Sequence, residues 1–144
     1  MHLGSFLSAA ATLLFTGTAL AGPASAPHAA ACVAALKAEE SHLGETLHAG
    51  APVEPELLQV VRSGIAIIGT QYLAGLREAE ARQLLQAAEK DFQELPPPDA
   101  EARQADCLRE GQALYKGASA FERSLITSAA QRRIKRIRAA AQGE

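Results

Sequence analysis

The stretch from Glu56 to Leu95, ELLQVVRSGIAIIGTQYLAGLREAEARQLLQAAEKDFQEL, decides how this chain folds. It contains no proline, whereas prolines stand just before it and directly after it. Its apolar residues recur at steps of three and four, which is the spacing of an amphipathic helix. These residues are Leu58, Val61, Ile65, Ile68, Tyr72, Leu76, Leu84, Leu85, Ala88, Phe92 and Leu95. The stretch therefore predicts a long helical spine against which the other segments pack.

The two halves of this spine differ in composition. Gly64, Gly69 and Gly75 interrupt the apolar first half, whereas mixed charges fill the second half from Arg77 onward. A glycine with small or polar neighbours is a recognised place for a helix to kink. We therefore expect a bend between Gly64 and Gly75, a buried first half and a more exposed second half.

The segments on either side also have helical periodicity. Pro27 opens a first helix, which Gly50 and Pro52 end. A last helix follows Pro98 and carries an apolar stripe that continues to Ile137. No alternation of strand type is present, so the sequence predicts an all-α fold. The expected architecture is a small bundle of three long helices, in which a kinked central helix would give a four-helix appearance.

The two cysteines, Cys32 and Cys107, test this architecture. In an oxidising compartment an even pair predicts one disulfide. In a straight up-down-up bundle, however, Cys32 would lie level with Phe121, roughly 20 Å from Cys107. A disulfide needs Cα atoms within about 7 Å. A bent spine, an extended chain around Cys32 or an intermolecular bond would each resolve the conflict, and we favour the bend.

The first residues have the pattern of a signal peptide. The segment from Leu3 to Leu20 is apolar, and Ala19-Leu20-Ala21 is an A-x-A cleavage signal. Residues 1–21 are thus predicted to be removed, which leaves residues 22–144 as one helical domain in the periplasm or secreted. An uncleaved membrane anchor is the alternative, although serine and threonine dilute the apolar run.

A run on the first predicted helix has the residue types of a metal site, Glu39-x-x-His42-x-x-Glu45-x-x-His48. Di-iron bundles use Glu-x-x-His, but on two helices, and this chain has no histidine after His48. His42, Glu45 and His48 are candidate ligands for a surface Zn²⁺ or Cu²⁺. An exposed polar helix face is the simpler interpretation.

The C-terminal end is strongly basic. From Ile126 onward the chain carries five positive charges and one negative charge, whereas the rest carries nine positive and fifteen negative charges. A block of one sign predicts contact with an anionic membrane surface or an acidic protein partner. Favourable interaction with the helix dipole, or pairing with acidic residues of the spine, is the simpler interpretation. The residues are Arg132, Arg133, Lys135, Arg136 and Arg138.

Two carboxylates, Glu40 and Glu122, interrupt apolar stripes and would need partners if they were buried. Together they are weak candidates for acid-base catalysis, because a catalytic pair also needs a pocket. No phosphate-binding loop, nucleophile elbow, C-x-x-C motif or haem attachment motif is present. We therefore expect neither an enzyme nor a resident cofactor.

These features predict an exported helical module that binds a protein partner in the cell envelope without catalysis. An inhibitor or immunity protein that blocks an exported enzyme or toxin is the second hypothesis, and a metal-binding protein is the third. Aromatic residues make up only 4% of the chain, which limits the core and keeps a homodimer among the alternatives. No stacking aromatics accompany the basic run, so nucleic acid is not an expected partner.

Overall fold

The computed structural model describes residues 24–143, which fold into five α-helices without a strand. They are α1 (Ala26–His48), α2 (Glu54–Leu73), α3 (Glu78–Gln93), α4 (Pro97–Gly117) and α5 (Ala120–Ala141). The predicted all-α fold is confirmed, whereas the predicted count of three helices is wrong. None of the described helices is long and apolar enough to cross a membrane. The predicted signal peptide, residues 1–21, lies outside the described residues.

The spine from Glu56 to Leu95 divides into α2 and α3. Gly75 adopts a φ of 101°, a left-handed conformation that glycine accepts without a steric penalty. The Gly75 N–H donates to the Tyr72 carbonyl, and the Leu76 N–H donates to the Gln71 carbonyl, both at a distance of 3.0 Å. This pair of hydrogen bonds is the Schellman motif, which ends a helix. The predicted bend is thus a complete break at the end of the expected interval. The predicted contrast is confirmed, because α2 contains seven buried residues and α3 has none.

The predicted last helix also divides, into α4 and α5. Ser119 caps α5: its hydroxyl accepts from the Glu122 N–H at 3.2 Å, and the Glu122 carboxylate accepts from the Ser119 N–H at 2.7 Å. This reciprocal pair is a capping box, whose sequence signature is Ser-x-x-Glu. The signature is present after Gly117, but the apolar stripe that runs through it hid the boundary.

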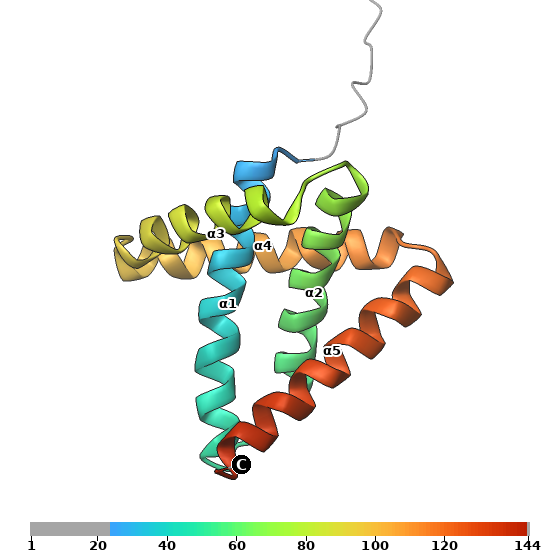
Figure 1. Ribbon diagram of the computed structural model, residues 1–144. Helices are drawn as coiled ribbons and strands as arrows, with labels where there is room; N and C mark the ends of the chain where they lie inside the picture. The colour runs from blue at the N-terminus through green and yellow to red at the C-terminus, as the bar shows by residue number, and fades with distance from the viewer. Residues whose placement is uncertain (1–23, 144) are drawn as a thin grey trace, which may run out of the picture.

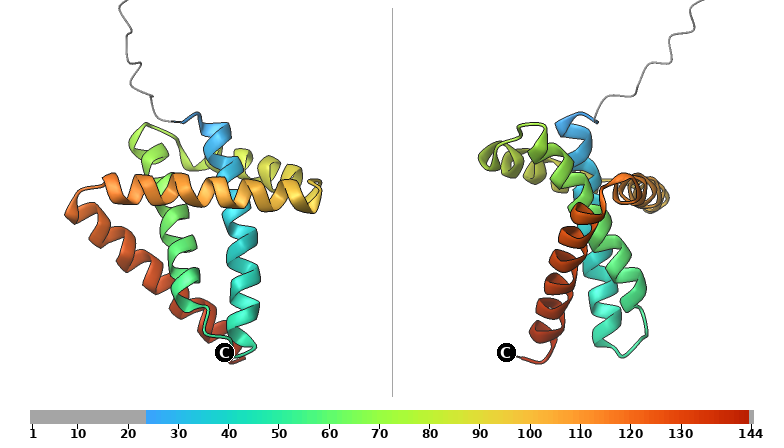
Figure 2. Two further views of the ribbon diagram at one scale, coloured as in Figure 1. Left: turned by 180° about the vertical axis from the view of Figure 1, so that it is seen from behind. Right: turned by 90° about the vertical axis from the view of Figure 1, so that its right-hand side faces the viewer.

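Helices α1 and α2 lie side by side and run in opposite directions (Figure 1). Helix α4 crosses one face of this pair, which we call the back face, and α3 crosses α1 on the opposite, front face (Figure 2). Helix α5 runs obliquely across the front of α2 towards the lower end of α1. The expected arrangement with parallel first and last helices is therefore wrong, because α4 lies across the pair rather than along it.

The core is built mainly from α1 and α2 and has two parts. The upper part includes Cys107 of α4, and the lower part includes Ala130 and Ile134 of α5. Leu43 of α1 packs against both parts. Helix α4 thus covers the upper end of the α1–α2 pair, and α5 covers the lower end.

At the back face, α4 is fixed to both helices of the pair. Cys32 and Cys107 form the predicted disulfide within one chain, with their Cα atoms 5.1 Å apart. One turn further along α4, a Cβ atom added to Gly111 would lie 2.5 Å from the Ser63 Cβ and 2.7 Å from the Ser63 carbonyl oxygen. The backbones of α2 and α4 therefore touch at this point. The transverse course of α4 resolves the register conflict of the cysteines.

Candidate binding groove on the front face

A groove of about 400 Å³ lies on the front face, between α1 and α2 and bordered by α3 and α5. No residue of α4 lines it. Its apolar floor is formed by Val33, Leu36, Val60, Val61, Ile65, Ile68 and Leu85, and its polar rim by Lys37, Glu40, Arg133 and Arg136.

Helical spacing brings these side chains to one surface. Val33, Leu36, Lys37 and Glu40 stand at positions i, i+3, i+4 and i+7 of α1, which share one helix face. On α2, Gly64 lines the groove between the floor residues, and a Cβ added there would meet no atom within 4 Å. The absent side chain deepens the groove at its centre.

Ion pairs hold part of the rim. The Arg133 guanidinium lies 2.7 Å from the Glu40 carboxylate, whose side chain is only 15% exposed. Lys37 pairs with Glu89 of α3. Glu40, which was predicted to need a partner if it were buried, thus pairs with Arg133 of α5. Glu122 serves as a helix cap, so the two carboxylates have separate structural roles.

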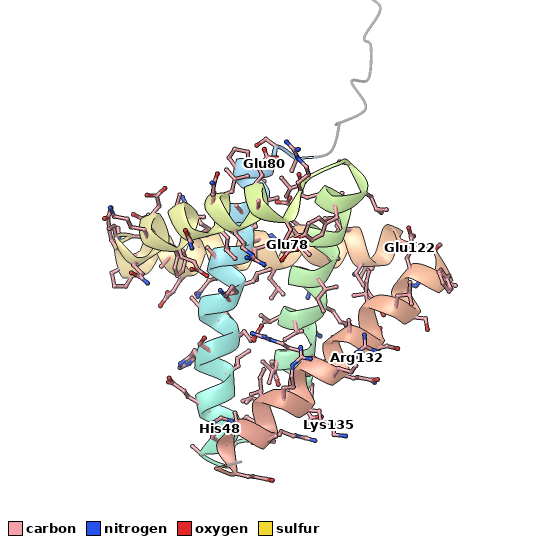
Figure 3. All side chains as sticks on the ribbon, in the orientation of Figure 1. His48, Glu78, Glu80, Glu122, Arg132 and Lys135 are labelled. Atoms are coloured by element: carbon pink, nitrogen blue, oxygen red, sulfur yellow. A yellow bond between two sulfur atoms is a disulfide. The ribbon has the colours of Figure 1, made fainter. Side chains whose placement is uncertain are left out.

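The structure divides the predicted basic surface in two. Arg133 pairs with Glu40, and Arg138 pairs with Glu54 at the start of α2. Within residues 24–143, no ion pair involves the other three basic residues. Of these, Arg132 and Lys135 project outward from α5 (Figure 3), and Arg136 lines the groove. Ion pairs thus engage two of the five cations, but with Glu40 and Glu54, which lie outside the spine from Glu56 to Leu95. The other three remain available for a partner.

The first half of α5 also exposes apolar side chains. Phe121 and Leu125, one turn apart, are 72% and 54% exposed. They lie outside the groove lining. The apolar periodicity of the sequence predicted that this stripe is buried. In the structure it is buried only from Ala130 onward, where α5 reaches the core.

The predicted metal run lies on α1. His42 and Glu45 are exposed, and the His48 Nε2 atom lies 3.0 Å from the Ile137 carbonyl oxygen of α5. That distance fits a hydrogen bond donated by the His48 ring to the backbone. His42, Glu45 and His48 are not drawn together around a common point, since the group of three candidate ligands gathered within residues 24–143 lies elsewhere. Metal binding by the run stays a prediction.

No protein-family model matches the chain, and neither the curated proteins nor the solved structures include a significant match. The groove and its surroundings are therefore the features of the molecule that bear on its function.

Proposed function

We propose that this protein is a non-enzymatic binding module of the cell envelope that holds an acidic amphipathic helix of a protein partner in the front groove. The observation that carries the proposal is the apolar floor beside Arg136, the cation of the rim that has no ion-pair partner within residues 24–143.

The floor offers apolar surface that a partner can cover. Ile65, Ile68 and Leu85 are only partly buried, although they sit against the buried core. Removing apolar surface from water is worth about 25 cal/mol per Å². A partner that inserts apolar side chains here would complete the packing of the front face.

The charge of the rim selects a partner with carboxylates. Arg136 lines the groove, and Arg132 and Lys135 stand on the same helix. Charge complementarity contributes to specificity and to the rate of association. A basic partner would meet repulsion along α5, which also argues against pairing of two copies through this helix.

The dimensions of the groove fit a docked helix. On α1, the lining from Val33 to Glu40 covers two turns, or roughly 10 Å. A helix that docks through residues i, i+4 and i+7 presents anchors over the same length. Small-molecule sites bury about 70–90% of their ligand, whereas this groove is partly open to solvent. The open shape favours a helix over an enclosed small ligand.

The disulfide supports an oxidising compartment, as an exported protein would meet. Export would place the groove among envelope or secreted proteins. An inhibitor of an exported enzyme would use the same surface and would form a tight one-to-one complex.

Two matched synthetic peptides test the proposal. Both are helical and carry leucine at i, i+4 and i+7, and they differ only in having glutamate or lysine at the flanking positions. We expect the acidic peptide to shift the backbone amide NMR signals of groove residues on α1, α2 and α5. The basic peptide should bind at least tenfold more weakly.

A pair of glycine substitutions provides the control. Gly64→Leu would fill the groove, whereas Gly69→Leu places the same side chain in α2 outside the groove lining, and neither Cβ would meet an atom within 4 Å. Gly64→Leu should abolish binding of the acidic peptide, and Gly69→Leu should retain it. Equal binding of the two peptides, or full binding by Gly64→Leu, would contradict the proposal.

Vesicles distinguish a membrane-surface role. If anionic phospholipid vesicles shift the signals of Phe121, Leu125 and Arg132, while the acidic peptide shifts none in the groove, the basic helix is a membrane contact instead. The proposal expects the opposite pattern.

A further inference from the structure

A second cluster of chemically active side chains surrounds the disulfide on the back face. His28 and Cys32 are four residues apart on α1, and Cys107 and Glu110 are three residues apart on α4. Each spacing places its pair on one face of its helix. The two faces meet where α4 crosses α1, with the cysteine Cα atoms 5.1 Å apart.

The distances in this cluster resemble those around a tetrahedral metal ion. The His28 Nε2 atom lies 2.8 Å from the Glu110 Oε2 atom, and the Cys32 Sγ atom lies 3.8 Å from the former and 3.7 Å from the latter. Ligand atoms bound tetrahedrally to Zn²⁺, with Zn–S of about 2.3 Å and Zn–N or Zn–O of about 2.0 Å, lie roughly 3.3–3.5 Å apart. The two distances to sulfur are close to these values, whereas the His28–Glu110 distance is that of a hydrogen bond and would have to lengthen by about 0.5 Å around a bound ion. Among the described residues, these three form the group of candidate metal ligands that lie within 4.8 Å of one another.

The cluster is open to an entering ion. The side chains of His28 and Glu110 are 52% and 30% exposed. They border a hollow of about 400 Å³ that both cysteines line, with Asp99 at its edge. The two cysteines are themselves buried, so an entering ion would first meet the exposed His28 and Glu110 side chains.

We infer that reduction of the disulfide converts this cluster into a Zn²⁺ site with His28, Cys32, Cys107 and Glu110 as its four ligands. A dithiol reductant would supply two electrons and two protons, become a disulfide itself and leave two thiols on the protein. Zn²⁺ would then displace the two thiol protons and bind both thiolates. In the oxidised protein the sulfurs are bonded to each other, and only two ligands remain.

The consequence is that α1 and α4 stay joined in both redox states, by a covalent bond in one and by a metal in the other. The two Cys ligands and the Glu ligand offset the charge of the ion, and the neutral His28 ring supplies its Nε2 lone pair. The site is independent of the front groove, because no residue is shared between them.

Cobalt and zinc titrations test the inference. The protein would be reduced under nitrogen with a phosphine, which does not compete for metal as a thiol does, and titrated with Co²⁺. One equivalent should produce the intense visible bands of tetrahedral Co²⁺ and a near-ultraviolet sulfur-to-cobalt band, and Zn²⁺ should abolish both. The oxidised protein should produce neither.

Two ligand variants make the assignment specific. His28→Ala and Glu110→Gln keep the disulfide, so each can be shown to fold when oxidised and then be reduced. Each should lower the Zn²⁺ affinity of the reduced protein at least tenfold in competition with a chromophoric chelator. Glu101→Gln, a matched control at an exposed residue of α4 that does not line the hollow, should leave the affinity unchanged. The inference is overturned if the reduced protein takes up no stoichiometric metal, or if neither ligand variant weakens the binding.

Discussion

The two faces of the α1–α2 pair are held in opposite ways. On the back face, α4 is bonded to α1 through Cys32 and Cys107, and its backbone touches α2 where Gly111 meets Ser63. On the front face, α3 and α5 border the pair but leave a groove of about 400 Å³. At Gly111 and Ser63 small residues let two backbones approach on the back face, whereas on the front face the space between the four helices remains open as the groove.

This difference indicates that the back face supports the structure, whereas the front face is the surface for binding. The back face fixes α1 relative to α2, so the floor of the groove keeps its shape before a partner arrives. Such preorganisation lowers the ordering cost of binding. On the front face, exposed ion pairs such as Lys37–Glu89 contribute only about 0–1 kcal/mol each. The part of the floor that α1 and α2 supply is therefore preorganised, whereas the ion pairs that join α3 and α5 to α1 add little to the rigidity of the rim.

Removal of the disulfide should have the largest effect on this contrast. The Cys32→Ala, Cys107→Ala double variant opens a loop of 75 residues. In the chain-entropy model, closing a loop of this length stabilises the fold by about 4 kcal/mol. We expect the free energy of unfolding of the double variant, measured by urea denaturation with a chelator present, to fall by about this amount. The reduced wild-type protein should show the same fall. A decrease of less than about 1 kcal/mol in the free energy of unfolding would contradict the proposed difference between the faces, because packing alone would then hold the back face.

The Gly111→Ala substitution tests the close contact on the same face. The added Cβ would lie 2.5 Å from the Ser63 Cβ, so α2 and α4 must separate. Overpacking of about 3 kcal/mol outweighs a helix-propensity gain of about 1 kcal/mol, which gives a net destabilisation of about 2 kcal/mol in urea denaturation.

Gly69→Ala is the matched control, since its Cβ would meet no atom within 4 Å. It should stabilise the protein by up to about 1 kcal/mol. If both variants stabilise the protein alike, the two helices are not in tight contact.

The back face also shows what a sequence can and cannot predict. The disulfide follows from the number of cysteines, and the conflict between the Cys32–Cys107 pairing and a straight bundle correctly signalled that the simple architecture was wrong. The transverse course of α4 could not be derived, because apolar periodicity gives the buried face of a helix but not the angle at which it crosses a neighbour. The need for a glycine at position 111 cannot be predicted from the sequence, because it depends on Ser63 of α2 lying directly opposite.

For the helices of the front face, the sequence contains local signals for the helix boundaries, but the continuous apolar stripe outweighed them in the prediction. Both helix boundaries had markers, Gly75 for the end of α2 and Ser119-x-x-Glu122 for the start of α5. In each case the apolar stripe continued across the boundary and favoured one helix. The groove itself depends on how Arg133 and Arg136 of α5 meet α1 and α2, which is a tertiary fact that no local pattern contains.

A smaller effect is expected from the Arg133–Glu40 pair, which joins α5 to α1 on the front face. A double-mutant cycle with Arg133→Met and Glu40→Gln should give a coupling energy below about 1 kcal/mol, reduced further by added salt. The Arg82–Glu78 pair, with both side chains at least 70% exposed, is the control and should couple still more weakly. A coupling above about 2 kcal/mol would mean that the front face is held as firmly as the back.

The smallest expected effect concerns Glu122, in the first turn of α5, directly after the connection from α4 of the back face. Hydrogen bonds from the Ser119 backbone and then from its side chain hold the pKa of the Glu122 carboxyl below its ordinary value. Because folding lowers this pKa, the stabilisation is complete above the unfolded pKa and is lost as the pH falls through the folded pKa. Glu122→Gln should therefore differ most from wild type near neutral pH, and the difference in urea midpoint should vanish in acid.

Ser119→Ala separates the two causes of this shift. It removes the side-chain contribution but keeps the backbone N–H, which is the larger cause. The pKa of Glu122, followed by carboxyl ¹³C NMR, should rise only part of the way to its ordinary value. A stability difference between Glu122→Gln and wild type that stays constant with pH would show that the charge does not hold the turn. In that case α5 would be positioned on the front face by Ala130 and Ile134 in the core, and its first half, with Phe121 and Leu125 exposed, would be free to move with a partner.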